Sequence, residues 1–171
     1  MFLEAIVISV IIGFIRGGNL RGFRRLNKIT MFLFILGVVI QYLLPSIGDF
    51  ANMSNMELIV KFSKPIQILS YILILIGILT NINFRSLWVV LVGYLLNFIS
   101  TVLNGWAMPN IVENGLENVK LPVLGKTIQF FEPYPFPKVL SLGDIIIAFG
   151  IFSLIQEIML SDEPYRSGYR F

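Results

Sequence analysis

Four polar side chains recur at spacings of three and four residues within one long apolar run, which places them on a single face of a helix. They are Asn97, Ser100, Thr101 and Asn104. Together with Trp106 as a cover and Asp144 at the start of a later apolar stretch, these side chains predict a binding pocket for a neutral or cationic ligand. An anion is not expected there, because Asp144 would repel it. The alternative interpretation is structural, since such groups also hydrogen-bond between helices and Asp144 also caps its own helix.

The composition excludes most enzymatic and metal chemistry. The chain of 171 residues contains neither His nor Cys, so thiolate nucleophiles, imidazole bases and His or Cys metal ligands are ruled out. No glycine-rich loop has the spacing that cradles a phosphate. We therefore expect no catalytic residue, no metal site and no cofactor. Glu113, Glu132 and Asp144 would have to meet beside the bundle to support a carboxylate-dependent reaction.

Three uncharged apolar runs indicate that lipid, rather than water, surrounds most of this chain. Ile29–Gly48 and Pro65–Phe84 are each 20 residues long, and Ser86–Val112 is 27 residues long. About 18 such residues suffice for a helix to cross a hydrocarbon core of about 30 Å. Charged residues make up 13% of the chain, against about 25% in soluble domains. The sequence therefore predicts an integral membrane protein.

The predicted fold is an all-α membrane protein, a bundle of five transmembrane helices that forms a single domain over residues 1–171. The expected helices cover residues 2–15, 29–47, 66–83, 86–103 and 142–160, with an outer loop at 104–141 and a tail at 161–171. Residues 2–15 lack the basic start and the cleavage site of a signal peptide, so we interpret them as a retained helix. Ser141 and Asp144 have the spacing of a capping box at the start of the last helix. Four spans is the main alternative.

Small residues recur at every fourth position along the first predicted helix. They are Ala5, Ser9, Gly13 and Gly17. A stripe of this kind lets a neighbouring helix approach closely, so we expect it to pack within the bundle. A dimer interface and chance spacing are the alternatives.

Basic residues orient the predicted bundle. The first connection between helices carries five cations and no acid: Arg16, Arg21, Arg24, Arg25 and Lys28. Short loops rich in Lys and Arg stay in the cytoplasm, which predicts an outer N-terminus and a cytoplasmic C-terminus. We also expect these residues to contact anionic lipid head groups. Membrane topology alone demands such a loop, so the cluster does not indicate nucleic-acid binding.

The outer loop at 104–141 is rich in proline and aromatic residues. Its aromatics are Trp106, Phe130, Phe131, Tyr134 and Phe136. A flexible linker would be polar and poor in aromatics, so we expect this loop to fold back over the bundle with its aromatics at the level of the head groups. A structural cap and a binding lid both fit this pattern. A short hairpin over residues 119–131, turning at Leu124-Gly125-Lys126, is a further alternative, in which Pro122 would sit on an edge.

Three patches of sequence resemble a known family. They are Arg16-Gly17-Gly18, Asn104-Gly105 followed by Met108-Pro109, and Tyr134-Pro135-Phe136-Pro137 leading into Ser141-Leu142-Gly143-Asp144. Together they resemble DUF5317, a family of small bacterial integral membrane proteins that is classed only as a domain of unknown function. The resemblance implies a multi-pass protein of the bacterial cytoplasmic (inner) membrane, and it carries over no activity and no catalytic residue.

Three functions remain as hypotheses. The favoured one is a non-enzymatic membrane module that senses a ligand or binds a partner, either another membrane protein or a second copy of this chain. The second is a small transporter, or the membrane subunit of one, that uses the polar stripe from Asn97 to Asn104. The third and weakest is a carboxylate-dependent enzyme that acts on lipid-linked substrates.

Overall fold

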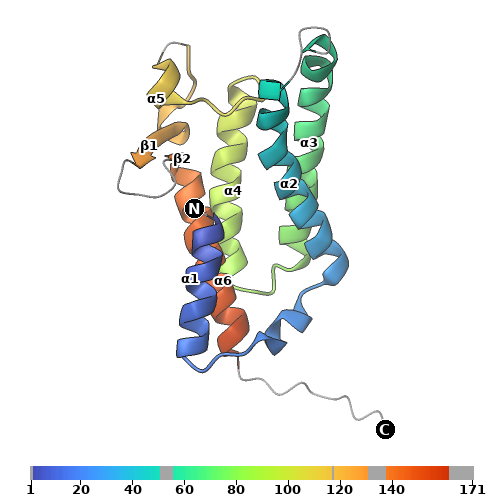
Figure 1. Cartoon of the computed structure of the whole chain (residues 1–171), viewed down its shortest axis with the longest axis vertical. Helices are drawn as coiled ribbons and strands as arrows, with labels where there is room; N and C mark the ends of the chain where they lie inside the picture. Colours follow the sequence, from blue (N-terminus) through green and yellow to red (C-terminus); the bar gives the residue numbers. More distant parts are fainter. Residues whose placement is uncertain (1, 51–55, 117, 131–137, 162–171) are drawn as a thin grey trace.

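The computed structural model of the chain describes residues 2–50, 56–116, 118–130 and 138–161, which are mostly helical (Figure 1). The long helices within these ranges are α1 (Phe2–Ile15), α2 (Lys28–Phe50), α3 (Met56–Thr80), α4 (Ser86–Leu103) and α6 (Leu142–Leu160). The short elements are the 3₁₀ turns η1 (Leu20–Arg25) and η2 (Pro122–Leu124), the single helical turn α5 (Ile111–Asn114), and the strands β1 (Lys126–Phe130) and β2 (Lys138–Ser141).

Three segments of the described chain are helices long and apolar enough to cross a membrane. They are Phe62–Thr80 within α3, the whole of α4 and the whole of α6. α1 and the first part of α2, Lys28–Gln41, are apolar but shorter. The helices are therefore compatible with the membrane protein that the sequence predicts. A bundle of five spans and its orientation remain predictions.

The helix bounds differ from the predicted ones mainly in α3. The predicted ranges 2–15, 86–103 and 142–160 coincide with α1, α4 and α6, and α2 runs slightly past both predicted ends. α3 begins at Met56 rather than at 66, so Pro65 lies inside the helix, where it removes one backbone N–H donor but its fixed φ is a helical one. α3 ends at Thr80 rather than at 83, since the Asn81 side chain donates to the Gly77 carbonyl oxygen and accepts from the Asn27 N–H, each at 2.9 Å. The chain turns there and continues into α4 (Figure 1).

The helices form two groups, with α2 packed along α3, and with α1 and α4 both packed on α6 (Figure 1). Glycines allow the close approach of α2 and α3. A Cβ at Gly37 would lie 2.8 Å from the Ser70 carbonyl oxygen, and a Cβ at Gly77 would lie 2.5 Å from the Phe34 Cβ. Small residues of this kind are how helix backbones come together where hydrophobic driving force is weak.

The buried core joins the two groups along the contact of α3 with α4. Its members are Tyr71, Ile74, Ile78, Leu87, Val90 and Tyr94. The Tyr94 hydroxyl donates to the Tyr71 carbonyl oxygen at 2.5 Å, and the two rings lie 5.7 Å apart. Phe98 packs against both rings and extends the aromatic contact towards the outer loop.

The outer loop contains a hairpin, but it is not the one predicted from the sequence. β1 pairs antiparallel with β2, so that Ile128 lies opposite Leu140. The predicted hairpin over 119–131 is wrong, because Pro122 has no N–H for a strand ladder and begins η2 instead. Gly125 ends η2, where its N–H donates to the Pro122 carbonyl oxygen at 2.9 Å, and it packs against Pro109. The predicted aromatics at 131, 134 and 136 lie outside the described residues.

Candidate functional site

α4 lies directly against α6 through two glycines, Gly93 on α4 and Gly150 on α6. A Cβ at Gly93 would lie 2.7 Å from the Gly143 carbonyl oxygen, and a Cβ at Gly150 would lie 2.8 Å from the Val90 backbone nitrogen. A side chain at either position would push the helices apart. Asn97, one turn beyond Gly93, therefore faces the first turn of α6.

Asn97 joins the capping box of α6. Its Nδ2 donates to Asp144 Oδ1 at 2.8 Å, and its Oδ1 accepts from the Ser141 hydroxyl at 2.8 Å. The Ser141 Oγ accepts from the Asp144 N–H, and the Asp144 Oδ2 accepts from the Ser141 N–H, both at 3.0 Å. The capping box predicted from the sequence is thus confirmed. The structure adds Asn97 as its partner on another helix.

These bonds limit the chemistry of the site. The Ser141 hydroxyl donates to an amide oxygen, which is too weak a base to activate a nucleophile. Both carboxylate oxygens of Asp144 accept hydrogen bonds from the protein itself. Within the described ranges, no three acidic residues gather to hold a metal ion. The contacts of Asn97 and Asp144 favour the structural interpretation, in which they join α4 to α6.

Asn104 and Trp106 hold the outer loop on the end of α4. Asn104 Nδ2 donates to the carbonyl oxygens of Ser100 and Lys120, at 2.8 and 2.9 Å, and its Oδ1 accepts from the Lys120 N–H at 2.8 Å. Trp106 has a φ of 69°, and its N–H donates to the Thr101 carbonyl oxygen at 2.8 Å, which closes the helix end. Its indole packs edge-on against Phe98. Both residues therefore fix the path of the chain after α4.

Thr101 and Ser100 are fully buried at the same level of α4. The Thr101 Oγ1 shares a hydrogen bond of 2.9 Å with the Tyr71 hydroxyl and lies 3.5 Å from the Met108 Sδ. The Ser100 Oγ has no hydrogen-bond partner within the described part of the chain. Among the six candidate residues, Ser100 is thus the one whose buried hydroxyl has no hydrogen-bond partner among the described residues.

The small-residue stripe of α1 packs on α6 through Ser9 and Gly13. The Ser9 hydroxyl donates to the Phe152 carbonyl oxygen at 2.8 Å, and a Cβ at Gly13 would lie 2.6 Å from the Met159 Sδ. Ala5, earlier on the stripe, is half-buried. Gly17 has no such contact, because nothing lies within 4 Å of a Cβ built on it and its φ of 80° ends the helix.

The ends of α1, α4 and α6 that lie nearest η1 carry charged and amide groups. All five candidate lipid-contacting cations are exposed and lie on or beside η1. The Arg16 Nη1 donates to the Gln156 Oε1 at 3.1 Å. The Glu157 carboxylate accepts from the N–H groups of Arg85 and Ser86, at 3.0 and 2.9 Å, and so caps the start of α4.

The residues that join elements but were not identified from the sequence include Tyr71, Met108 and Gln156. Gln156, whose amide donates to the Ser9 carbonyl oxygen at 2.6 Å, carried a usable signal. An amide inside an apolar helix is costly unless a neighbouring helix satisfies it. Tyr71 and Met108 carried no such signal, because their residue types are ordinary in apolar segments.

Comparison with protein families gives one match. The model of DUF5317, described as a family of unknown function, matches residues 25–116 and 110–156. The matches together cover residues 25–156, well over half of the chain, and confirm the resemblance that the motifs indicated. No curated protein and no solved structure matches the chain.

Proposed function

We propose that this chain, which belongs to the DUF5317 family of unknown function, is a multi-pass protein of the bacterial cytoplasmic membrane that binds another membrane protein. It acts without catalysis, and it contacts the partner through its outer cap. The outer cap consists of residues 106–116, 118–130 and 138–141, which follow α4 and lead into α6. The five long helices serve as its membrane spans.

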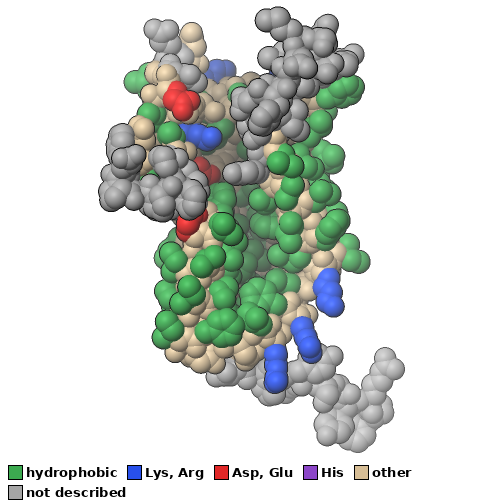
Figure 2. All heavy atoms as spheres, viewed as in Figure 1, with side chains coloured by type: hydrophobic (Ala, Val, Ile, Leu, Met, Phe, Trp, Pro, Cys, Tyr) green, Lys and Arg blue, Asp and Glu red, His purple; other side chains and the backbone are tan. Residues whose placement is uncertain are grey.

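The distribution of charge supports an orientation with the outer cap outside the cell. At the end of the molecule that holds η1, the charged side chains visible in Figure 2 are Lys and Arg, and the acid Glu157 there is engaged in capping α4, whereas both signs lie beside the outer cap. Arg24 and Lys28 belong to the basic end. Because unopposed cations in short loops are retained in the cytoplasm, the outer cap belongs on the opposite side.

Exposed apolar side chains on the outer cap carry the proposal of a partner. Leu116, Leu121 and Val123 are 65%, 49% and 71% exposed. The Asn104 side chain holds the backbone of this segment through hydrogen bonds to the N–H and the carbonyl oxygen of Lys120. Exposed apolar side chains that form a contiguous patch are typical of protein–protein and membrane contact surfaces.

The backbone of the outer cap supports the same proposal. Leu121 has a φ of 52°, in the left-handed region where a branched side chain costs about 1–2 kcal/mol. Backbone strain of this kind persists where the surrounding structure holds it, and it concentrates at binding sites. The strained residue here is also one of the exposed apolar ones, which is the arrangement expected of a preformed contact.

Photocrosslinking in cells tests the proposal. A photoreactive amino acid at position 116 should form an adduct with one discrete membrane protein, and Val123→Asp in the same chain should abolish that adduct. The matched control is the same probe at position 149, since Phe149 is 63% exposed on α6 and would face lipid. Identical adducts at 116 and 149, or an adduct at 116 that Val123→Asp leaves unchanged, would contradict a partner site on the outer cap. An adduct with the chain itself would make the partner a second copy.

A small transporter is the second candidate, favoured by the division of the helices into two groups. A carrier would separate α3 from α4 during its cycle, which would expose Ile74 in their shared core. Because the chain has no Cys, Ile74→Cys provides a single buried thiol for labelling by an impermeant reagent in membranes. A binding module predicts that this thiol stays protected, whereas a carrier predicts steady labelling.

A further inference from the structure

The contact between α3 and α4 is the seam that joins the two helix groups. Glycine contacts close each group within itself, as at Gly37 between α2 and α3 and at Gly93 between α4 and α6. α3 meets α4 through the large side chains of Tyr71, Tyr94 and Phe98 instead. Helices that slide or hinge do so where side chains can repack. The seam is therefore the place where one group can move relative to the other.

Both chain connections between the two groups lie at the end of the molecule that holds η1 (Figure 1). η1 links α1 to α2, and the turn at residues 81–85 links α3 to α4. At the other end, the chain after α2 returns as α3 within the same group, and the chain after α4 returns as α6 within the other. A movement between the groups would therefore hinge at the η1 end and open the seam at the end that holds the outer cap.

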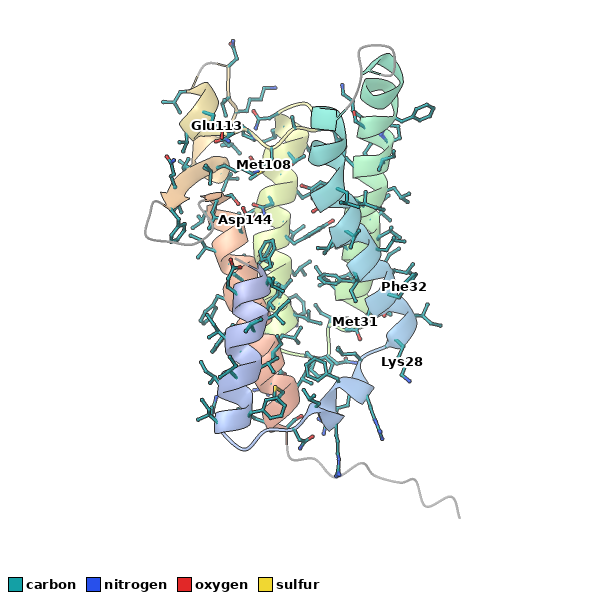
Figure 3. All side chains as sticks on the ribbon, in the orientation of Figure 1. Lys28, Met31, Phe32, Met108, Glu113 and Asp144 are labelled. Carbon is teal, nitrogen blue, oxygen red and sulfur yellow. The ribbon has the colours of Figure 1, made fainter. Side chains whose placement is uncertain are left out.

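Three side chains form a relay that crosses the seam and ends on the outer cap. The Tyr71 hydroxyl of α3 lies 2.9 Å from the Thr101 Oγ1 of α4, which lies 3.5 Å from the Met108 Sδ. In Figure 3, Met108 lies between the levels of Glu113 and Asp144. A thioether sulfur has no proton to donate, so Thr101 is the donor to Met108 and Tyr71 is the donor to Thr101. The relay thus has one direction, and each of its hydrogen bonds strengthens the other.

The relay reaches the exposed apolar surface of the outer cap through Pro109, which follows Met108. The Pro109 carbonyl oxygen accepts from the Lys126 N–H at 2.8 Å, and Gly125 packs against the same residue. Gly125 ends η2, which carries the exposed side chain of Val123. A displacement of Met108 would therefore shift η2 and, with it, part of the surface that contacts the partner.

We propose that the relay regulates the partner site by tying the outer cap to the position of α3. While the seam is closed, Tyr71 holds Thr101 and Met108 in place, and the outer cap presents Val123 to the partner. Opening of the seam withdraws the Tyr71 hydroxyl and releases Met108. The partner is thus bound when the two helix groups are closed and released when they part. This inference rests on the proposed function, because it regulates the same site.

Hydrogen exchange of the purified full chain in mild detergent tests the relay without the partner. Tyr71→Phe removes only the hydroxyl and should raise exchange at the N–H groups of the outer cap by about threefold, which corresponds to one hydrogen bond between membrane helices. Met108→Leu keeps the apolar volume and should have the same effect. Tyr94→Phe is the matched control, because it also removes one buried hydroxyl from the seam, but that hydroxyl donates within the seam to the Tyr71 carbonyl oxygen. It should leave exchange in the outer cap unchanged.

The double variant tests whether the relay acts as a unit. Tyr71→Phe combined with Met108→Leu should exchange no faster than either single variant, because each change already breaks the same chain of bonds. Additive increases, unchanged exchange in Tyr71→Phe, or an equal increase in Tyr94→Phe would each overturn the relay. The crosslink from position 116 should weaken about threefold in Tyr71→Phe and persist in Tyr94→Phe. A crosslink that ignores Tyr71→Phe refutes the regulation alone, and a responsive outer cap without any crosslink refutes the partner site alone.

Discussion

Replacing Asn97 by alanine tests whether the polar cluster between α4 and α6 stabilises the bundle or serves a ligand. The Asn97 side chain makes two hydrogen bonds, one to Asp144 and one from Ser141. Asn97→Ala removes both bonds, so the Ser141 hydroxyl loses its acceptor and the Asp144 Oδ1 loses its donor. If the cluster is structural, the variant should be less stable. If it is a ligand site, the protein should stay equally stable and lose only its cellular function.

The magnitude follows from the number of bonds lost. Hydrogen bonds between membrane helices contribute about 0.6 kcal/mol on average, with a maximum near 1.7 kcal/mol. Two such bonds predict a loss of about 1–3 kcal/mol in the free energy of unfolding. For a chain of this size, each kcal/mol lowers the melting temperature by about 2–4 °C. Asn97→Asp should be worse than Asn97→Ala, because it places a second carboxylate beside Asp144 and removes the donor.

The assay is thermal unfolding of the purified protein in mild detergent. Asn83→Ala is the matched control, because Asn83 is exposed in the turn between α3 and α4 and should be replaced without loss. The reasoning would be refuted if Asn97→Ala and Asn83→Ala melted at the same temperature. That result, together with loss of the crosslink from position 116, would assign Asn97 to a binding site after all.

Three further experiments test the orientation and the helix contacts. Of Arg24→Cys and Lys120→Cys, only the thiol at 120 should react with an impermeant reagent on intact cells, and the reverse pattern would place η1 outside. Gly22→Ala should cost about 1–3 kcal/mol, because its Cβ collides with a backbone carbonyl of α6; an unchanged melting temperature would mean that η1 is not packed there. Glu157→Ala should cost about 1 kcal/mol, because the first N–H groups of α4 lose their acceptor. The exposed Glu113→Ala is its control, and equal melting of the two would argue against the cap.

Local patterns were enough to predict the helices that local features define. α4 and α6 match their predicted bounds because Asn104-Gly105 ends the first inside a longer uncharged run, and the Ser141–Asp144 capping box starts the second. Both signals involve residues within one segment, so a single sequence contains them completely. α3 was predicted less well, because proline was taken as a helix start although a helix can continue through Pro65.

The sequence by itself determined that the chain is built of apolar helices, where a helix is capped, and which end of the bundle is basic. Only the tertiary structure decided which groups meet. Ser9 and Gln156 lie 147 residues apart, and Asn97 and Asp144 lie 47 residues apart. Nothing local specifies these pairs, because a polar residue in an apolar helix needs a partner but the spacing within its own helix does not say which one. β1 also depends on a distant partner, since the Lys126 N–H at its start donates to the Pro109 carbonyl oxygen at 2.8 Å.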